Sequence, residues 1–391
     1  MIFSHGLGGS RNTYSQILGN VASHGIVVIA ADHRDKSSPI SYVRATDKTE
    51  AQTVDYEKMA HTPTAEVYAG RDKQLKIRLW ELGLIHDATL KIDKGHYPHN
   101  LDPNSSSHKR DDTIDVLKMF VGNLDVHEPG TIIWAGHSFG AATIVQLLKS
   151  TYWQTREKGN SLDAPLFNPS PTSSIANQIS PSSPAILLDM WCLPFRSNGT
   201  RSLWEKPMPC YAPSGPGGVA ILAVLSEAFF KWSGNIKDTK RVLCPPTGTG
   251  QSGKPGPRLF YPQSSAHLSQ SDFGVLFPWL TRKVLKTDDP ERYIQLNARA
   301  ILQVLRENEY DLAGPSMTEV EEDTNQSKSE TKDFTARKNQ DWKILDGNGA
   351  VPGWVAIEVS PEADSHISTE NDVQSPSDTV VENEVLGDVK M

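Results

Sequence analysis

The sequence Gly-His-Ser-Phe-Gly at residues 136–140 constrains the fold more than any other feature of the chain. An apolar run at 131–135 precedes it, and a helical pattern of apolar residues follows at 141–148. A Gly-X-Ser-X-Gly motif between a buried strand and a helix is typical of a nucleophile elbow, in which the glycines relieve crowding around a strained central residue. The pattern therefore predicts that the Ser138 hydroxyl is exposed where a helix begins. An ordinary tight turn is the alternative.

Apolar runs and helical patterns alternate along most of the chain. The predicted strands lie at 1–4, 25–31, 131–135, 185–188 and 219–225, and the predicted helices at 66–90, 111–124 and 290–308. Continuous apolar strands separated by amphipathic helices are typical of a parallel sheet that is covered on both faces. We therefore expect a mostly parallel, doubly wound α/β sheet. Stretches rich in Ser, Pro, Asn and Gly predict surface excursions at 151–184 and 244–258.

Charge divides the chain into two parts. Residues 316–391 hold 17 acidic and 6 basic residues, whereas the whole chain carries a formal charge of -8, so the remainder is weakly basic. A segment this acidic, with few periodic apolar positions, buries too little surface to offset the entropy of ordering. We expect a catalytic domain at 1–314 and an acidic, largely disordered tail at 315–391. Two apolar clusters in the tail, at 341–345 and 354–357, could dock on the domain.

Composition argues against several classes of function. No apolar run reaches the roughly 20 residues that cross a bilayer, and no basic stripe with interleaved aromatic residues suggests nucleic acid as a partner. The three cysteines lack metal-ligand spacing, so we expect no disulfide framework, metal or other cofactor. The loop at 248–255 nearly matches a phosphate-binding P-loop, but Pro255 stands where Ser or Thr must hold magnesium. As the chain stands, these features favour a soluble, cytoplasmic protein.

A seryl nucleophile needs an imidazole base and a carboxylate that orients the imidazole. Behind an elbow of this kind the carboxylate follows first along the chain and the histidine second, each on a loop after a strand. Asp189 ends the first predicted strand after the elbow helix, although a helix cap or a surface aspartate is the alternative. The only histidine after Asp189 and outside the acidic tail is His267, so elimination selects it as the base. A surface histidine without a catalytic role is the alternative.

Two backbone amides are the candidates for an oxyanion hole. One belongs to the residue after the nucleophile, Phe139, and the other to an early strand-to-helix loop, where the glycines at 6, 8 and 9 surround Leu7. Glycines permit a close approach between backbone and substrate. We therefore predict that the amides of Leu7 and Phe139 bind a developing oxyanion. A tight turn without this role is the alternative for the loop.

Several separate blocks of sequence together resemble the plasma-type platelet-activating factor acetylhydrolases, an α/β-hydrolase family that includes fungal members. The blocks lie at 3–9, 22–25, 32–37, 136–143, 188–194, 225–229 and 266–273. They cover most of residues 1–310 and select the same Ser138, Asp189 and His267. The family's fold normally has further strands before the oxyanion loop, so the resemblance implies that the first strands are missing and that the N-terminus is incomplete.

The resemblance implies calcium-independent hydrolysis of the sn-2 ester of phospholipids that carry short or oxidised acyl chains. A phospholipid is then the expected substrate. Most of the apolar residues around 229–232 and 273–280 are expected in the core. The others are candidates for an acyl pocket or for peripheral contact with lipid surfaces. Two alternatives stay open. The chain could hydrolyse small carboxylic esters or polyester fragments, or it could be an inactive fragment or a binding-only homologue.

Overall fold

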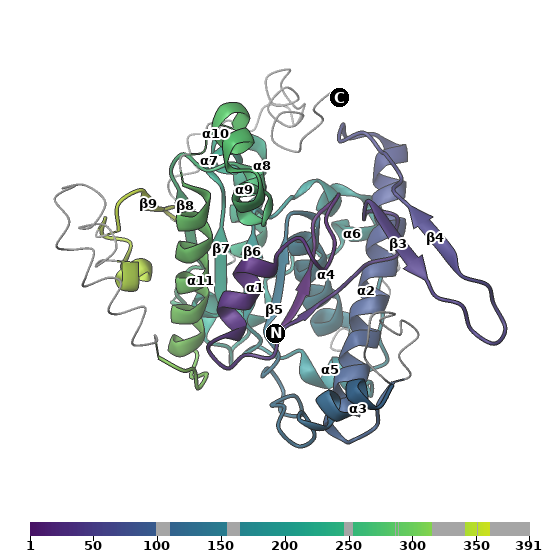
Figure 1. Ribbon diagram of the computed structural model, residues 1–391. Helices are drawn as coiled ribbons and strands as arrows, with labels where there is room; N and C mark the ends of the chain where they lie inside the picture. Colours follow the sequence, from purple (N-terminus) through teal and green to yellow (C-terminus); the bar gives the residue numbers. More distant parts are fainter. Residues whose placement is uncertain are drawn as a thin grey trace.

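The computed structural model describes residues 1–98, 110–154, 165–245, 253–285, 287, 289–314, 341–349 and 351–359. A seven-stranded sheet runs through this structure in the order β2-β1-β5-β6-β7-β8-β9 (Figure 1). Its strands are β1 (Ile2–Ser4), β2 (Ile29–Ala30), β5 (Trp134–His137), β6 (Ala185–Leu188), β7 (Ile221–Val224), β8 (Arg258–Pro262) and β9 (Trp354–Ala356). All neighbouring pairs are parallel except β8 and β9, which are antiparallel.

Helices cover both faces of the sheet. On one face α1 (Ser15–Ala22) packs against α11 (Pro290–Glu307), and on the other α2 (Ala65–Asp93) packs against α4 (Phe139–Gln154) (Figure 1). Side chains that alternate along a strand point to opposite faces, which divides the apolar core into two layers. The predicted α/β architecture with a mostly parallel sheet is confirmed.

Shorter elements complete the structure. The α-helices are α3 (Arg110–Lys118), α5 (Ser174–Gln178), α6 (Asn198–Arg201), α7 (Glu227–Lys231), α8 (Ser233–Leu243), α9 (Phe273–Leu276) and α10 (Pro278–Leu285). The 3-10 helices are η1 (Leu193–Arg196), η2 (Pro209–Tyr211), η3 (Gly217–Ala220), η4 (His267–Gln270) and η6 (Asp341–Asp346). A separate antiparallel hairpin, β3 (Ile40–Val43) and β4 (Gln52–Asp55), projects from the body (Figure 1).

Some element boundaries differ from those predicted. The run at 25–31 forms only a two-residue strand, because β2 lies at the sheet edge and pairs with β1 alone. The helix predicted at 111–124 spans Arg110–Lys118, and Gly122 turns the chain with a φ of 68°. In the loop that resembles a P-loop, Lys254 donates hydrogen bonds to carbonyls of 212, 213 and 215, so this lysine fastens a neighbouring loop.

The two apolar clusters of the acidic segment pack on the body. Ile344 and Leu345 of η6 are buried against α11, while β9 extends the sheet and Trp354 stacks on Phe260 with ring centroids 5.4 Å apart. Residues 315–340, 350 and 360–391 lie outside the described part of the chain, as do 155–164 and 246–252 of the two excursions. The division into domains stays a prediction.

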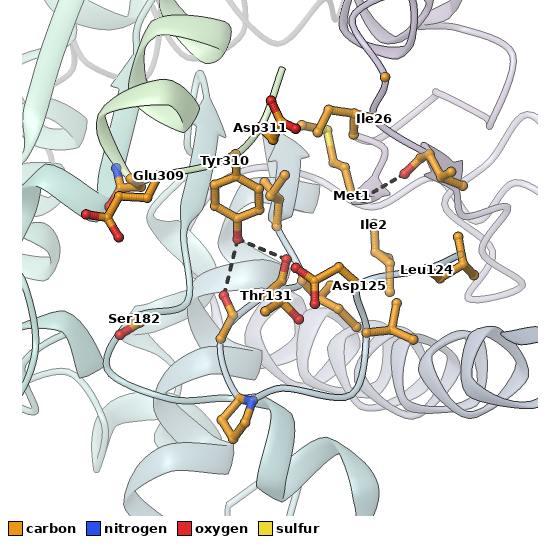
Figure 2. Close-up of a pocket in the computed structure, with 18 of the residues that line it drawn as sticks. Met1, Ile2, Ile26, Leu124, Asp125, Thr131, Ser182, Glu309, Tyr310 and Asp311 are labelled. Carbon is orange, nitrogen blue, oxygen red and sulfur yellow. Dashed lines mark hydrogen bonds between the residues drawn. The ribbon is translucent and has the colours of Figure 1, made fainter. Parts of the chain in front are cut away.

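The two ends of the sheet differ in character. At the amino ends of the strands lies a cavity of about 730 Å³ whose lining includes Met1, Ile26 and Asp311 (Figure 2). Across one side of it, the Tyr310 hydroxyl donates to the carbonyls of Gly130 and Thr131, at 3.2 and 2.9 Å. Ligands of open parallel sheets bind beyond the carboxyl ends of the strands, where Ser138 follows β5. The candidate site therefore lies at the carboxyl ends of the strands.

Candidate active site

The chain makes a strained turn at Ser138, between β5 and α4. The residue has a φ of 55°, in the left-handed region that non-glycine residues rarely adopt. The flanking glycines are required by close packing: a Cβ on Gly136 would lie 2.5 Å from the backbone of Gly140, and one on Gly140 would lie 2.0 Å from the carbonyl oxygen of Ser4. The strand, turn and helix around Ser138 therefore have the geometry of a nucleophile elbow.

Asp189 and His267 meet although 78 residues separate them. Asp189 directly follows β6, and its Oδ2 lies 2.9 Å from Nδ1 of His267, the first residue of η4 after β8. The backbone amide of Ser226 donates to the other carboxylate oxygen. Both side chains are buried. The structure thus brings the predicted carboxylate and imidazole into direct contact.

The ring of His267 is held between two other rings. Its centroid lies 4.4 Å from that of His137 and 4.5 Å from that of Phe229, with interplanar angles of 28° and 17°. Because Asp189 occupies Nδ1, Nε2 is the nitrogen left to accept a proton. Ser138 and His267 both line one pocket of about 310 Å³. Within the described residues no hydrogen bond joins the Ser138 hydroxyl to the His267 ring, whose bond is to Asp189. Catalytic contacts of this kind often tighten only when substrate binds.

Burial shifts the proton affinities of the pair. It lowers the pKa of His267 to about 3, and it raises the pKa of Asp189 to about 7 against the opposing effects of His137 and of the Ser226 amide. The pKa of His137 also lies well below its usual value, chiefly because the ring is buried. Burial therefore favours the uncharged imidazole of His267, which is the form able to accept a proton.

The predicted oxyanion-hole amides lie beside this pocket. In the loop after β1, the amides of Gly6, Gly8 and Gly9 donate to Tyr14 Oη, Ser37 O and Gly6 O. In contrast, the amides of Leu7 and Phe139 donate no hydrogen bond to any other residue that the structure describes. A Cβ on Gly6 would come 3.1 Å from Ser138 Cβ, so the loop approaches the elbow closely. Both amides have the capacity to bind a ligand oxygen.

Two further residues fasten the site and were missed by sequence reasoning. The hydroxyl of Tyr14 accepts the Gly6 amide at 3.0 Å and is hydrogen-bonded to His137 Nδ1 at 2.8 Å, which links the loop to the elbow. Asp272 accepts the amides of Ser15 and Gln16, at 2.7 and 2.9 Å, and so ties the histidine loop to α1. In the sequence, Tyr14 belongs to an apolar helical pattern and Asp272 to a polar loop, and such patterns carry no signal for long-range hydrogen bonds.

A buried polar network lies behind the oxyanion loop. Arg78 of α2 forms an ion pair with Asp35, with 2.6 Å between Nε and Oδ2, and both side chains are completely buried. Next to it, Ser4 Oγ lies 2.8 Å from His33 Nε2, and His33 Nδ1 lies 2.7 Å from Glu81 Oε2. Arg78 occupies an apolar position beside Leu75, Leu79 and Leu82 of α2, which is the signal that could have revealed it.

One cluster among the described residues has the ligand types and spacing of a metal site. It consists of His137, Asp189 and His267, whose nearest ligand atoms all lie within 4.8 Å of one another. Several of these atoms already have partners: Asp189 and His267 bind each other, and His137 Nδ1 contacts Tyr14. The arrangement is accounted for as a hydrogen-bonded group.

Comparison with known proteins agrees with this geometry. Residues 1–328 match the model of a family described as platelet-activating factor acetylhydrolase, isoform II. The chain belongs to this family. Its members are ester hydrolases of the α/β-hydrolase fold, so the resemblance seen in the sequence is confirmed.

Several curated proteins are similar to this chain at identities between 24% and 35%, over segments of different length. A Schizosaccharomyces pombe protein named "Putative phospholipase A2" is 29% identical over 326 residues, which cover 78% of this chain and 67% of that protein. The platelet-activating factor acetylhydrolase of Cavia porcellus is 35% identical over 38% of this chain and 31% of its own length. That of Gallus gallus is 24% identical over 79% of this chain and 61% of its own length.

Proposed function

We propose that this chain hydrolyses the sn-2 ester of phospholipids that carry a short or oxidised acyl chain, with Ser138 as nucleophile. The observation that carries the proposal is the convergence of the strained Ser138 and the Asp189–His267 pair on one pocket. The membership of the family supports the reaction class, and the names of the relatives support a phospholipid substrate. The pocket volume of about 310 Å³ suits a short acyl group better than a long one.

The geometry supports a two-step acyl transfer. Nε2 of His267 accepts the proton of the Ser138 hydroxyl as Oγ attacks the sn-2 carbonyl carbon, and Asp189 stabilises the imidazolium that forms. The amides of Leu7 and Phe139 bind the tetrahedral oxyanion. Collapse expels the lysophospholipid alkoxide, which takes the proton from His267, and water then releases the acyl group by the same route. The nucleophile is a side chain of the protein, so the proposal includes independence from calcium.

The test is hydrolysis of a 1-alkyl-2-acetyl phosphatidylcholine by the full chain, followed as release of acetate and lysolipid, with and without EDTA. We expect turnover that EDTA does not change. Turnover of p-nitrophenyl acetate without turnover of the phospholipid would contradict the proposed substrate and favour the small-ester alternative. Loss of phospholipid turnover in EDTA would contradict independence from calcium.

Contact with lipid surfaces forms part of the proposal. Leu276, Phe277 and Trp279 of the α9–α10 segment are 68%, 51% and 68% exposed, and α9 packs against η4, which begins with His267. An exposed apolar patch beside a lipase-type pocket is suited to touch the surface that supplies the substrate. No helix in the described ranges is both long and apolar enough to span a bilayer.

Co-sedimentation with phosphatidylcholine vesicles tests this contact. The double variant Phe277→Ala and Trp279→Ala should bind vesicles about tenfold more weakly, since each ring buries a large apolar area at an interface. Trp80→Ala is the matched control, because Trp80 is 60% exposed on α2. Equal loss in both variants, or no loss in the double variant, would contradict the assignment.

A further inference from the structure

The oxyanion loop needs a support that keeps its amides directed at the pocket. Leu7 can offer its amide to a ligand only if the backbone on either side of it is held fixed. On the C-terminal side, the Gly8 amide donates to the carbonyl oxygen of Ser37 at 2.8 Å. On the N-terminal side, the carbonyl oxygen of His5 accepts a hydrogen bond from Arg78 Nη1 at 2.7 Å. Both anchors lead to the same buried guanidinium.

Arg78 has contacts from all three of its nitrogens. Besides Nη1, which binds the carbonyl of His5, Nε donates to Asp35 Oδ2 at 2.6 Å and Nη2 donates to Ser37 Oγ. Ser37 Oγ in turn donates to the other carboxylate oxygen of Asp35. The planar guanidinium therefore fixes His5 directly and Gly8 through Ser37, on both sides of Leu7. A lysine ammonium has no fork of this kind.

The same cation also contacts the second half of the hole. The Cζ of Arg78 lies 4.5 Å from the centroid of the Phe139 ring, and the amide of Phe139 is the other candidate donor to the oxyanion. Phe139 is fully buried, so its ring packs against this guanidinium away from solvent. One side chain thus connects the two backbone segments whose amides must point to a single ligand oxygen.

We propose that Arg78 is a positioning residue for the oxyanion hole: it holds the Leu7 and Phe139 amides in the arrangement that binds the transition state. This inference rests on the proposed function, since it assigns a role within the same site. Arg78 is not among the residues that line the pocket of Ser138 and His267, so we expect it to act without direct contact with substrate. Its loss should therefore weaken binding of the transition state while leaving binding of the ground state almost unchanged.

The test compares Arg78→Lys with wild type in hydrolysis of p-nitrophenyl acetate. Removal of one oxyanion-hole donor lowers kcat by about 10² to 10³-fold in other hydrolases, so a displaced loop should lower kcat by about 10 to 100-fold with KM within about threefold. Inhibition by a trifluoromethyl ketone, which forms a tetrahedral oxyanion on serine, should weaken by the same factor as kcat. Unchanged kcat in a folded variant, or a rise in KM alone, would overturn the inference.

A matched control separates this role from the general effect of a buried arginine. Arg71 is also fully buried on α2, donates to Gln74 at 2.8 Å, and its Cζ lies 5.2 Å from the centroid of the Trp191 ring. It also lies over the Phe139 ring, at 5.8 Å against 4.5 Å for Arg78, but it has no hydrogen bond to the oxyanion loop among the described residues, so the control isolates the loop contacts. Arg71→Lys should lower kcat less than Arg78→Lys, and an equal loss would overturn the inference.

A second variant keeps the inference testable if Arg78→Lys does not fold. Ser37→Ala keeps the charges of Arg78 and Asp35 and removes only the hydroxyl that bonds to both. It should therefore lower kcat by a smaller factor than Arg78→Lys, with unchanged KM. Unchanged kcat in Ser37→Ala would also count against the role of Arg78. An inactive wild type would contradict the proposed function itself. An active wild type with full activity in the variants would contradict only the role of Arg78.

Discussion

Two groups of serine, histidine and carboxylate side chains lie within this fold, and we call them the Ser4 chain and the Ser138 chain. Their surroundings differ. In one, Ser4, His33 and Glu81 are joined by hydrogen bonds of 2.8 and 2.7 Å. In the other, Ser138, Asp189 and His267 meet at a pocket, and only the carboxylate and the imidazole are in hydrogen-bond contact. The first has the tighter contacts, but Ser4 and His33 are completely buried and do not line that pocket.

The comparison shows that residue types and short distances do not by themselves make a catalytic group. A nucleophile must reach a substrate, and it needs donors for the charge that develops on the substrate. Ser138 has a strained backbone, a pocket and two available amides, whereas Ser4 lies within a regular strand. The Ser4 chain is therefore expected to stabilise the fold, and the Ser138 chain to carry the reaction.

Replacing each serine by alanine should give the largest difference in kcat between the Ser4 chain and the Ser138 chain. Ser138→Ala should lower kcat toward p-nitrophenyl acetate by about 10⁶-fold, because the nucleophile is lost. Ser4→Ala should stay within about tenfold of wild type and lose about 1–3 kcal/mol of unfolding free energy, since His33 loses a buried partner. Steady-state kinetics and urea unfolding measure the two effects. Comparable loss of kcat in both variants would contradict the comparison.

Replacing the carboxylates should change kcat in the same direction, with a larger loss for Asp189 than for Glu81 but by a smaller factor than for the serines. Asp189→Asn should lower kcat by about 10⁴-fold, because an amide would donate to Nδ1 of His267 and leave the proton on the wrong nitrogen. Glu81→Gln should keep kcat within about tenfold of wild type. Both replacements preserve side-chain volume, so similar unfolding midpoints are the control. A large loss of kcat in Glu81→Gln would show that the Ser4 chain takes part in the reaction.

The pH dependence of kcat/KM should report the protonation of the Asp189–His267 pair. Burial raises the pKa of Asp189 to about 7, and the pair that it forms with His267 takes up one proton as the pH falls through that value. With this proton on either partner, Nε2 no longer accepts the seryl proton. We therefore expect kcat/KM to fall on the acidic side with a midpoint near pH 7. A profile that is flat between pH 8 and 5 would contradict this assignment.

The pH dependence of stability should come mainly from histidines that lack a carboxylate of raised pKa. Burial lowers the pKa of His86 to about 4 and those of His5 and His137 well below 6.5. In the unfolded chain these rings bind protons below about pH 6.5, so the unfolding free energy should fall as pH decreases, by about 1.4 kcal/mol per pH unit for each ring. In the two histidine–carboxylate pairs, the raised pKa values of Glu81 and Asp189 offset this effect.

Urea unfolding at pH 7.5 and 5.5 measures this effect. His86→Gln should flatten the dependence, because it removes one ring whose proton uptake differs between the two states. Stability that stays constant or rises toward pH 5.5 in wild type would contradict the assignment of these rings as uncharged.

The sequence was informative where local pattern and chain order determine the structure. The elbow around Ser138 follows from a strand, a turn and a helix that are adjacent in sequence, and Asp189 and His267 follow from the order of residues after strands. The short β2 edge strand and the β3–β4 hairpin were not predicted correctly, because edge pairing and a hairpin outside the main core leave little apolar periodicity.

The supports of the site were largely beyond sequence reasoning. Contacts such as Tyr14 with His137, or Arg78 with His5, join residues 123 and 73 positions apart, and they depend on how helices pack on the sheet. An arginine at an apolar helix position signals burial with a partner, but it does not identify that partner. The catalytic roles of Ser138, Asp189 and His267, and those of the Leu7 and Phe139 amides, stay predictions.

The most direct test is the site of covalent labelling by a fluorophosphonate, which attacks an activated serine in folded protein, followed by peptide mapping with mass spectrometry. The account predicts a single labelled peptide that carries the phosphonate on Ser138, and no labelling after heat unfolding. Failure of the folded protein to react, or attachment to Ser4 or another serine, would contradict it.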